Sequence, residues 1–121
     1  MPKKVLLVDD TETVLLFEKT LLRGTGHELR TANNGRKALD AVAADPPDLI
    51  LMDIMMPEMD GIEACRHLKE DPSTNTIPVV MVTTKGEPLM VERAFEAGCD
   101  DYVTKPLDKM ELLSKVRTYL A

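Results

Sequence analysis

Short apolar segments alternate with helical segments along almost the whole chain. Five segments are predicted to be strands, at residues 5–8, 28–31, 49–53, 77–82 and 102–104, and the fourth is expected to end in Thr83 and Thr84. Between and after them, apolar residues recur near the 3.6-residue spacing of a helix, and every predicted link is short. Because parallel strands need crossover connections, this alternation predicts an α/β doubly wound fold, a five-stranded parallel sheet covered by five helices.

Composition supports one globular domain. The chain has 121 residues, of which 44% are hydrophobic and 30% are charged, so it can bury a core without disulfides. The predicted elements leave no residues over, and we expect a single domain over residues 1–121 with no output domain. In the first helix the apolar stripe is predicted to contain Val14, Phe17, Leu21 and Leu22.

Charge and hydropathy exclude several classes of partner. The net charge of −6 argues against direct binding of nucleic acid, which depends on neutralising phosphates with Lys and Arg. No apolar stretch approaches the ~20 residues that a membrane span needs. Cys65 and Cys99 show no metal-ligand spacing, and we interpret them as free thiols of a cytoplasmic protein.

The run DLILMDIMMPEMDG, residues 48–61, presents a carboxylate where a buried strand should end. Four apolar residues precede Asp53, and a Met-Met-Pro turn follows it at once. Burying a charge is costly unless the charge is paired or bound to a metal. We therefore interpret Asp53 as a nucleophile that accepts a phosphoryl group.

Polar residues stand at the ends of four of the five predicted strands. Asp9 and Asp10 follow the first strand, Asp53 ends the third, Thr83 ends the fourth, and Lys105 follows the fifth. In an open parallel sheet these positions share the carboxyl edge, where doubly wound folds bind ligands. Each residue alone has an ordinary structural explanation, such as capping a helix. Their joint occurrence predicts a functional site.

Three acids in one crevice raise one another's pKa unless a cation compensates. A hard divalent ion with oxygen ligands fits, and Mg²⁺ is the expected ion. Lys105 would add a fixed positive charge, so that metal and ammonium together hold a phosphoryl donor in line with Asp53. Thr83 could donate a hydrogen bond to a phosphoryl oxygen.

With these residues in place, the chain resembles the receiver domain of two-component response regulators, in particular the stand-alone receivers of the chemotaxis type. The resemblance covers essentially the whole chain, through VLLVDD (5–10), DLILMDIMMPEMDG (48–61), PVVMVTT (78–84) and DYVTKP (101–106). It implies a flavodoxin-like sheet of strand order 2-1-3-4-5. It also implies that a sensor histidine kinase or phosphotransfer protein phosphorylates the chain, which then acts on an unknown downstream protein.

The resemblance implies roles for the residues around Asp53. Asp10 and Asp53 would bind Mg²⁺ through their side chains, Asp9 through water, and Met55 through its backbone carbonyl. Met55 and Lys85 lie at the two variable positions that tune the loss of phosphate in this family. We hypothesise that an apolar Met55 and a cationic Lys85 hinder the attacking water and lengthen the phosphorylated lifetime.

The resemblance also implies a conformational switch. Lys105 would pair with the carboxylate and then with the phosphoryl group, and its peptide bond to Pro106 would be cis. Thr83 and Tyr102 look like the switch pair, in which the hydroxyl moves to the phosphoryl group and the ring turns inward. A phosphoryl group adds about −1.5 to −2 charges, enough to bias the loop 84–88 between two arrangements.

The fourth helix, fifth strand and fifth helix are expected to form the surface that reports this change. The predicted outward positions there are Leu89, Val91, Arg93, Val103 and Lys115.

Two other functions use similar residues. Phosphatases of the haloacid-dehalogenase type also combine Asp, Lys, Thr and Mg²⁺, but they carry a second Asp two residues after the nucleophile as a general acid. Met55 stands there in this chain, so we expect a switch and not an enzyme. A pseudo-receiver that binds partners without phosphorylation is disfavoured because the sequence retains every site residue.

Overall fold

The computed structural model describes residues 2–84 and 87–121. One parallel sheet has the strand order β2-β1-β3-β4-β5. Its strands are β1 Lys4–Val8, β2 Glu28–Ala32, β3 Leu49–Asp53, β4 Val79–Thr84 and β5 Asp101–Lys105. The helices are α1 Glu12–Leu22, α2 Gly35–Ala44, α3 Gly61–Glu70, α4 Pro88–Glu96 and α5 Lys109–Leu120, with a short 3-10 helix, η1 Arg23–Thr25, after α1. The predicted fold class and strand order are confirmed.

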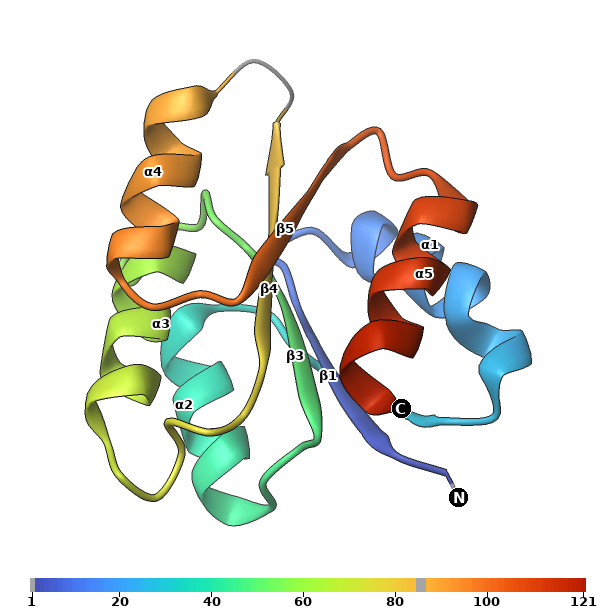
Figure 1. Ribbon diagram of the computed structural model, residues 1–121, viewed down its shortest axis with the longest axis horizontal. Coiled ribbons are helices and arrows are strands. Elements are labelled where there is room, and N and C mark those ends of the chain that lie inside the picture. The colour runs from blue at the N-terminus through green and yellow to red at the C-terminus, as the bar shows by residue number, and fades with distance from the viewer. Residues whose placement is uncertain (1, 85–86) are drawn as a thin grey trace.

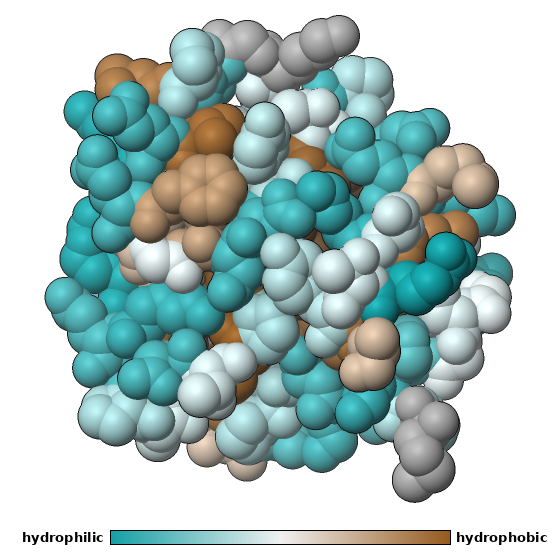
Figure 2. Space-filling model, in the orientation of Figure 1, coloured by the Kyte–Doolittle hydropathy of each residue, from teal (hydrophilic) through white to brown (hydrophobic). Residues whose placement is uncertain are grey.

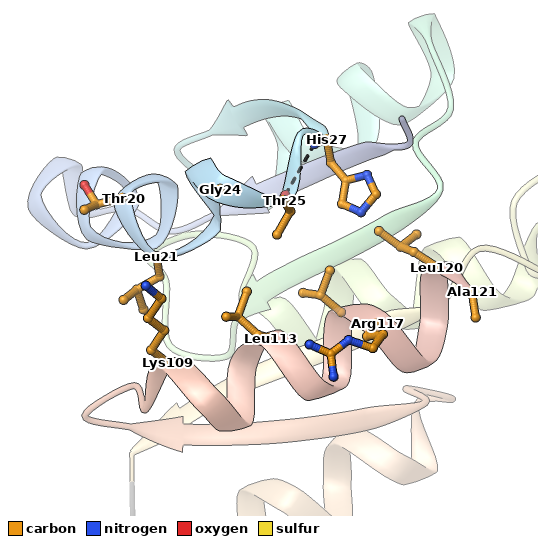
Figure 3. Close-up of a pocket in the computed structure, with 11 residues that line it drawn as sticks. Thr20, Leu21, Gly24, Thr25, His27, Lys109, Leu113, Arg117, Leu120 and Ala121 are labelled. Carbon is orange, nitrogen blue, oxygen red and sulfur yellow. Dashed lines mark hydrogen bonds between the residues drawn. The ribbon is translucent and has the colours of Figure 1, made fainter. Parts of the chain in front are cut away.

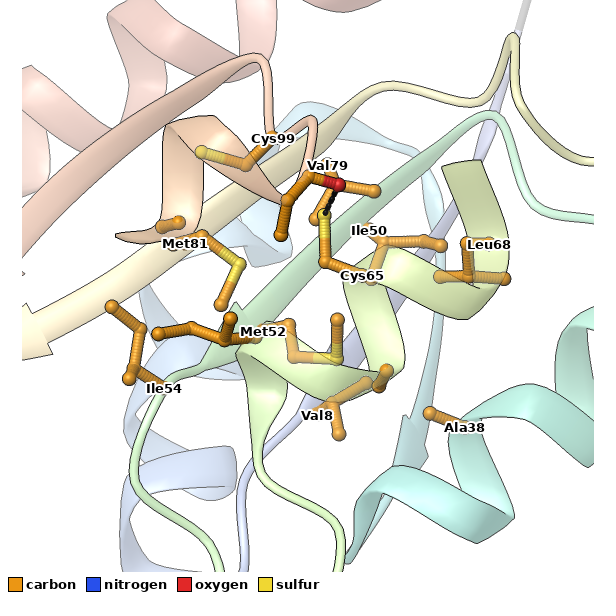
Figure 4. Packing of buried hydrophobic residues seen from close by; sticks show 14 of the residues in the cluster. Val8, Ala38, Ile50, Met52, Ile54, Cys65, Leu68, Val79, Met81 and Cys99 are labelled. Carbon is orange, nitrogen blue, oxygen red and sulfur yellow. Dashed lines mark hydrogen bonds between the residues drawn. The ribbon is translucent and has the colours of Figure 1, made fainter. Parts of the chain in front are cut away.

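Helices cover both faces of the sheet, α1 and α5 on one face and α2, α3 and α4 on the other (Figure 1). Because side chains alternate along a strand, β1 sends Leu6 and Val8 into one core and Val5 and Leu7 into the other. Both cores continue through β3, whose five residues are all buried. The core beneath α3 includes Met52, Cys65, Val79 and Met81 (Figure 4). A sheet buried on both faces explains the nearly unbroken apolar runs in the sequence.

The buried stripe of α1 differs from the predicted one. Its buried residues are Leu15, Glu18 and Leu22, whereas Phe17 is 47% exposed. Leu15, Glu18 and Leu22 follow the three- and four-residue spacing of one helix face, and Phe17 lies off that face. The prediction is confirmed for Leu22 and wrong for Phe17, and it passed over a charged residue on the stripe.

The fourth strand begins two residues later than predicted and ends at Thr84, as expected. Ile77 is buried but belongs to a turn, in which its N–H donates to the Thr74 carbonyl at 3.0 Å. Thr83 and Thr84 continue the ladder, opposite Thr104 and Lys105 of β5. A buried apolar residue before the strand was therefore mistaken for part of it.

Three helices begin at a side-chain cap. Asn34, Asp60 and Asp108 precede α2, α3 and α5, and each accepts a hydrogen bond from the backbone N–H three residues on, at 2.7, 2.8 and 3.0 Å. Such caps satisfy donors that the first turn of a helix leaves free. They fix where the helices start relative to the strand ends that carry the site.

The surface over α4 and β5 carries exposed hydrophobic side chains, among them Leu89, Phe95 and Tyr102. Figure 2 shows hydrophobic atoms gathered over α4, in the upper left of that view. Val103 was predicted to face outward here but is 1% exposed, because alternation along β5 turns it into the core beside α5. Among the described residues, no helix has both the length and the apolarity to span a membrane.

Candidate functional site

The carboxyl edge of the sheet gathers the predicted polar residues. Asp53 is the last residue of β3, the central strand, and Asp9 follows β1 beside it. Thr83 stands in β4 one residue beyond Val82, the register partner of Asp53, and Lys105 ends β5. Parallel strands end at one edge, so residues far apart in sequence meet there.

Three carboxylates and one ammonium form the centre of the site. Asp9, Asp10 and Asp53 each contribute an oxygen to a group whose members all lie within 4.8 Å of one another. Lys105 Nζ lies 3.2 Å from Asp53 Oδ1 and 3.4 Å from Asp9 Oδ2. Asp9 Oδ1 also accepts a hydrogen bond from the Thr11 N–H at 2.9 Å, which fixes its orientation. Asp9 and Asp53 are buried, and Asp10 is exposed.

The negative charges of the site are only partly compensated. Burial, followed by the charge of Asp9, raises the pKa of Asp53 to about 6 although Lys105 opposes the shift. Burial acts to lower the pKa of Lys105, but the charges of Asp53 and Asp9 outweigh it and the pKa is raised. Three carboxylates facing one ammonium therefore leave the site short of positive charge.

That shortage and the donor set fit a divalent cation. Carboxylate oxygens are the ligands that Mg²⁺ prefers, and Mg²⁺ sites commonly use one or two carboxylates and keep several water molecules. The oxygens of Asp9, Asp10 and Asp53 are close enough to share one ion. Asp10 opens the group to solvent, which gives an ion a path of entry.

The remaining predicted residues surround this centre. Thr83 is buried beside Asp53. Tyr102 lies outward on β5 and packs edge-on against Phe95 of α4, with ring centroids 6.1 Å apart. Met55, two residues after Asp53, has a side chain that is 65% exposed. Lys85 lies outside the described residues.

The connections after β3 and β5 have unusual backbone features. The Lys105–Pro106 peptide bond is cis. A Cβ added to Gly61, the first residue of α3, would lie 2.2 Å from the Asp53 carbonyl oxygen. The Gly61 N–H donates to the Ile54 carbonyl at 2.9 Å, which draws α3 against the end of β3. The loop that carries Asp53 thus depends on the absence of a side chain at Gly61.

Sequence reasoning missed Glu18. This residue of α1 is 1% exposed, and its Oε1 has no hydrogen-bond partner among the described residues. Burial raises its pKa to about 8, with Asp9 and Asp53 raising it further and Lys105 lowering it. Its spacing from Leu15 and Leu22 was the available signal, because it places an acid on the buried face of the helix.

A separate groove of about 480 Å³ lies between α1 and α5 (Figure 3). Leu21 and Leu113 face each other across it, and His27 reaches it from the segment before β2. It contains none of the predicted site residues. The groove is therefore separate from the carboxylate site at the carboxyl edge of the sheet.

Comparison with known proteins agrees with this geometry. Residues 5–117 match the response regulator receiver domain. The chain is 40% identical over 121 residues to the response regulator PleD of Caulobacter vibrioides, covering 98% of this chain but 26% of PleD. It is 37% identical to the polar-differentiation response regulator DivK of Brucella anthropi, covering 99% of this chain and 98% of DivK.

Among solved structures, the chemotaxis protein CheY4 of Vibrio cholerae superposes with a TM-score of 0.91 at 28% identity, covering 99% of this chain and 100% of that one. The chain thus spans about the full length of some relatives and about a quarter of another. With a match that runs through both cores and all four strand-end motifs, the chain belongs to the response regulator receiver domain family of two-component signalling.

Proposed function

We propose that this chain is a phosphorylation-dependent signalling switch that accepts a phosphoryl group on Asp53 from a histidine kinase or phosphotransfer protein. One observation carries the proposal. Asp53 shares its corner of the sheet with two further carboxylates within 4.8 Å and with the Lys105 ammonium at 3.2 Å. This set combines a nucleophile, ligands for a divalent ion and a fixed cation.

In this proposal Asp10 and Asp53 would bind Mg²⁺ through their carboxylates, Asp9 through a water molecule and Met55 through its carbonyl oxygen. Bound Mg²⁺ would neutralise charge that develops on the phosphoryl oxygens. The carboxylate distances and the raised pKa of Asp53 support the site. Excess negative charge is what a divalent cation would relieve.

The chain's own residues then carry out the transfer. An ionised Asp53 oxygen forms the new O–P bond while the P–N bond to the donor imidazole breaks. With a pKa of about 6, Asp53 is mostly ionised at pH 7 and can act as the nucleophile. Lys105, already within 3.4 Å of both buried carboxylates, would hold one of the three phosphoryl oxygens.

Phosphoryl transfer would change the positions of the Thr83 and Tyr102 side chains. The Thr83 hydroxyl donates to a phosphoryl oxygen, and Tyr102 turns from its outward position into the space that this movement frees. That turn would separate Tyr102 from Phe95 and change the surface of α4, β5 and α5, where Leu89 is also exposed. A downstream protein would recognise the changed surface.

We further propose that the chain does not turn over substrate as a phosphatase. Such enzymes need an acid to protonate the leaving group, and Met55 offers none at the position where haloacid-dehalogenase-type enzymes carry it. The acyl phosphate would therefore accumulate. Two free buried thiols are in keeping with a cytoplasmic switch.

Incubation with Mg²⁺ and acetyl phosphate tests the proposal. We expect intact-mass spectrometry to show one added phosphoryl group on the wild type and none on Asp53→Asn. Asp40→Asn, which changes an exposed acid of α2, should gain the group as the wild type does. No adduct on the wild type despite bound Mg²⁺ would favour a pseudo-receiver. Continuous release of phosphate from many monoesters would favour an enzyme.

A further inference from the structure

The groove between α1 and α5 is a hollow that the proposed phosphoryl transfer does not use. Its volume of about 480 Å³ falls within the range of small-molecule sites. Leu21 of α1 and Leu113 and Leu120 of α5 line it, and all three are only partly buried at the edge of the core that contains Val116. The groove therefore leaves apolar surface in contact with water, and a ligand with an apolar body would cover it.

Two cations line the same groove without an acidic partner. Lys109 and Arg117 are exposed and stand two helical turns apart on α5, roughly 12 Å along its axis. In the part of the chain that the structure describes, neither forms an ion pair with an acidic side chain or with Ala121 at the end of the groove. An ammonium and a guanidinium in this state can bind an anion from solution.

Charge distinguishes this groove from the other hollows of the surface. The chain has a net charge of −6, yet no Asp or Glu occurs among the described residues that line the groove. Four other hollows each include at least one acid in their lining, namely Glu12 in two of them, Glu70 and Asp71 in the third, and Glu111 in the fourth. Like charges in close contact oppose binding, so this groove is the one of the five that suits an anion.

His27 adds a hydrogen-bond donor on the wall opposite α5. Its ring extends into the groove from the segment before β2 (Figure 3). The Lys3 N–H donates to His27 Nδ1 at 3.0 Å. Because Nδ1 accepts this bond, the neutral imidazole carries its proton on Nε2, which can donate to a ligand. Donors thus stand on both walls of the groove, which suits a compact anionic head group.

We propose that the groove between α1 and α5 binds a small amphipathic anion, a linear apolar chain that ends in one carboxylate or phosphate group. The apolar chain would lie against Leu21 and Leu113. Arg117 and His27 would hold the head group, and Lys109 would add attraction at longer range. The groove contains none of the residues of the carboxylate site, so this proposal does not depend on phosphorylation of the chain.

An acidic helix of a partner protein is the alternative occupant. A helix is about 10 Å across with its side chains, so roughly one turn of it would fill a volume of this size. One turn makes a contact far below the area of a stable protein–protein interface. The size of the groove therefore favours the small ligand.

Binding of decanoate alone, below its micelle concentration, tests the proposal. Calorimetry measures its affinity, and NMR shifts of backbone amides and methyl groups locate it. Hexanoate keeps the head group with four fewer methylenes, and decyltrimethylammonium keeps the chain with a cationic head. Lys109→Gln with Arg117→Gln removes the charges of the groove. Lys37→Gln with Arg66→Gln removes equal charges from exposed positions of α2 and α3 and is the control.

We expect saturable binding of decanoate, with NMR shifts centred on Leu21, His27 and Leu113. Hexanoate should bind at least about tenfold more weakly, because each methylene contributes roughly fourfold when fully buried. The groove double variant should weaken decanoate binding about fivefold, as the loss of two exposed charge contacts predicts, and the control pair should stay within about twofold of the wild type.

Four results would overturn the proposal. Equal affinity for decyltrimethylammonium would mean that the groove takes apolar chains of any charge. Absent or unsaturable decanoate binding, or shifts centred on the exposed side chains of α4 and β5, would mean that no such site exists. An equal loss in both double variants would reduce the effect to net charge. A synthetic helix with Leu on one face and Glu on the other that binds at least about tenfold more tightly than decanoate, and loses this in the groove variant, would assign the groove to a protein partner.

Discussion

Glu18 places an ionisable group where water cannot solvate it. Burial raises its pKa from 4.5 to about 8, so the folded protein holds the proton more tightly than the unfolded chain does. Between these values the unfolded chain binds fewer protons, and the free energy of unfolding must fall as the pH rises. The stability associated with this proton is complete below about pH 4.5 and is lost by about pH 8.

Glu18→Gln should remove this dependence. The amide fills the same space and has no charge to bury, so the variant should gain on the order of 3 kcal/mol over the wild type between pH 5 and pH 8. Urea unfolding at several pH values measures the difference. Asp53 contributes a slope of the same sign in both proteins, and equal slopes in wild type and variant would contradict the expectation.

Met55 and Lys85 are the residues that we propose set the phosphorylated lifetime. Met55, two residues after Asp53, has an exposed side chain with no group that could orient a water molecule. Met55→Asn combined with Lys85→Glu should shorten the lifetime severalfold, because amide and carboxylate groups can direct water to phosphorus. Phosphate loss from the purified phosphoprotein measures it, with Leu16→Asn and Arg36→Glu as matched surface changes. Faster loss from the wild type than from the double variant would refute the idea.

At the scale of elements, the junction of β3 and α3 determines where Asp53 points. The Gly61 Cα faces the backbone of Asp53, and an added Cβ would lie 2.2 Å from its carbonyl oxygen and 2.8 Å from Met81 Cε. The methionine end can move, but the carbonyl is held in the strand. A side chain at residue 61 must therefore push α3 away from the site.

We expect Gly61→Ala to lower the free energy of unfolding by about 3 kcal/mol, a typical upper cost of overpacking, and to weaken Mg²⁺ binding by moving Asp53. Gly24→Ala provides the comparison, since no atom lies within 4 Å of its added Cβ. That variant should stay within about 0.5 kcal/mol of the wild type. Calorimetric Mg²⁺ titration and thermal unfolding measure both effects, and equal stability of the two variants would show that the junction can adjust.

Elements with one unambiguous signal were predictable from sequence. The bounds of β3 were predicted without error because its apolar run ends abruptly at Asp53. The start of β4 was wrong because Ile77 is buried in a turn, which hydrophobicity alone cannot distinguish from a strand. Val103 was misplaced because the alternation of an edge strand was not applied to it.

The site also contains residues that the sequence could predict and one that it could not. Asp9, Asp10, Asp53 and Lys105 could be brought together from topology alone, since parallel strands end at one edge. Glu18 could not, because its position depends on the rotation of α1 about its axis. That rotation follows from packing against the sheet, and a charged residue on the packed face ran against the hydrophobic pattern.

For the whole molecule, a metal ion that binds only the folded chain must stabilise it. The three clustered carboxylates exist as a site only when β1 and β3 are paired. At Mg²⁺ a hundredfold above its dissociation constant, the gain should be about 2.7 kcal/mol. Thermal unfolding with and without Mg²⁺ measures it, Asp10→Asn should lose most of the gain, and Asp40→Asn should keep it. An equal gain from NaCl at the same ionic strength would indicate general screening instead.

The two free cysteines can report transient opening of the packed core around them. Cys65 lies on the buried face of α3, where its Sγ donates to the Ala97 carbonyl at 3.8 Å, and Cys99 lies in the segment between α4 and β5 (Figure 4). Burial raises the pKa of Cys65 to about 11 and that of Cys99 to about 12, so neither thiol ionises in the folded protein at neutral pH. An alkylating reagent can reach them only during a transient opening. The order and rate of their alkylation would therefore measure how often the α3 and α4 side of the sheet opens, without an introduced cysteine.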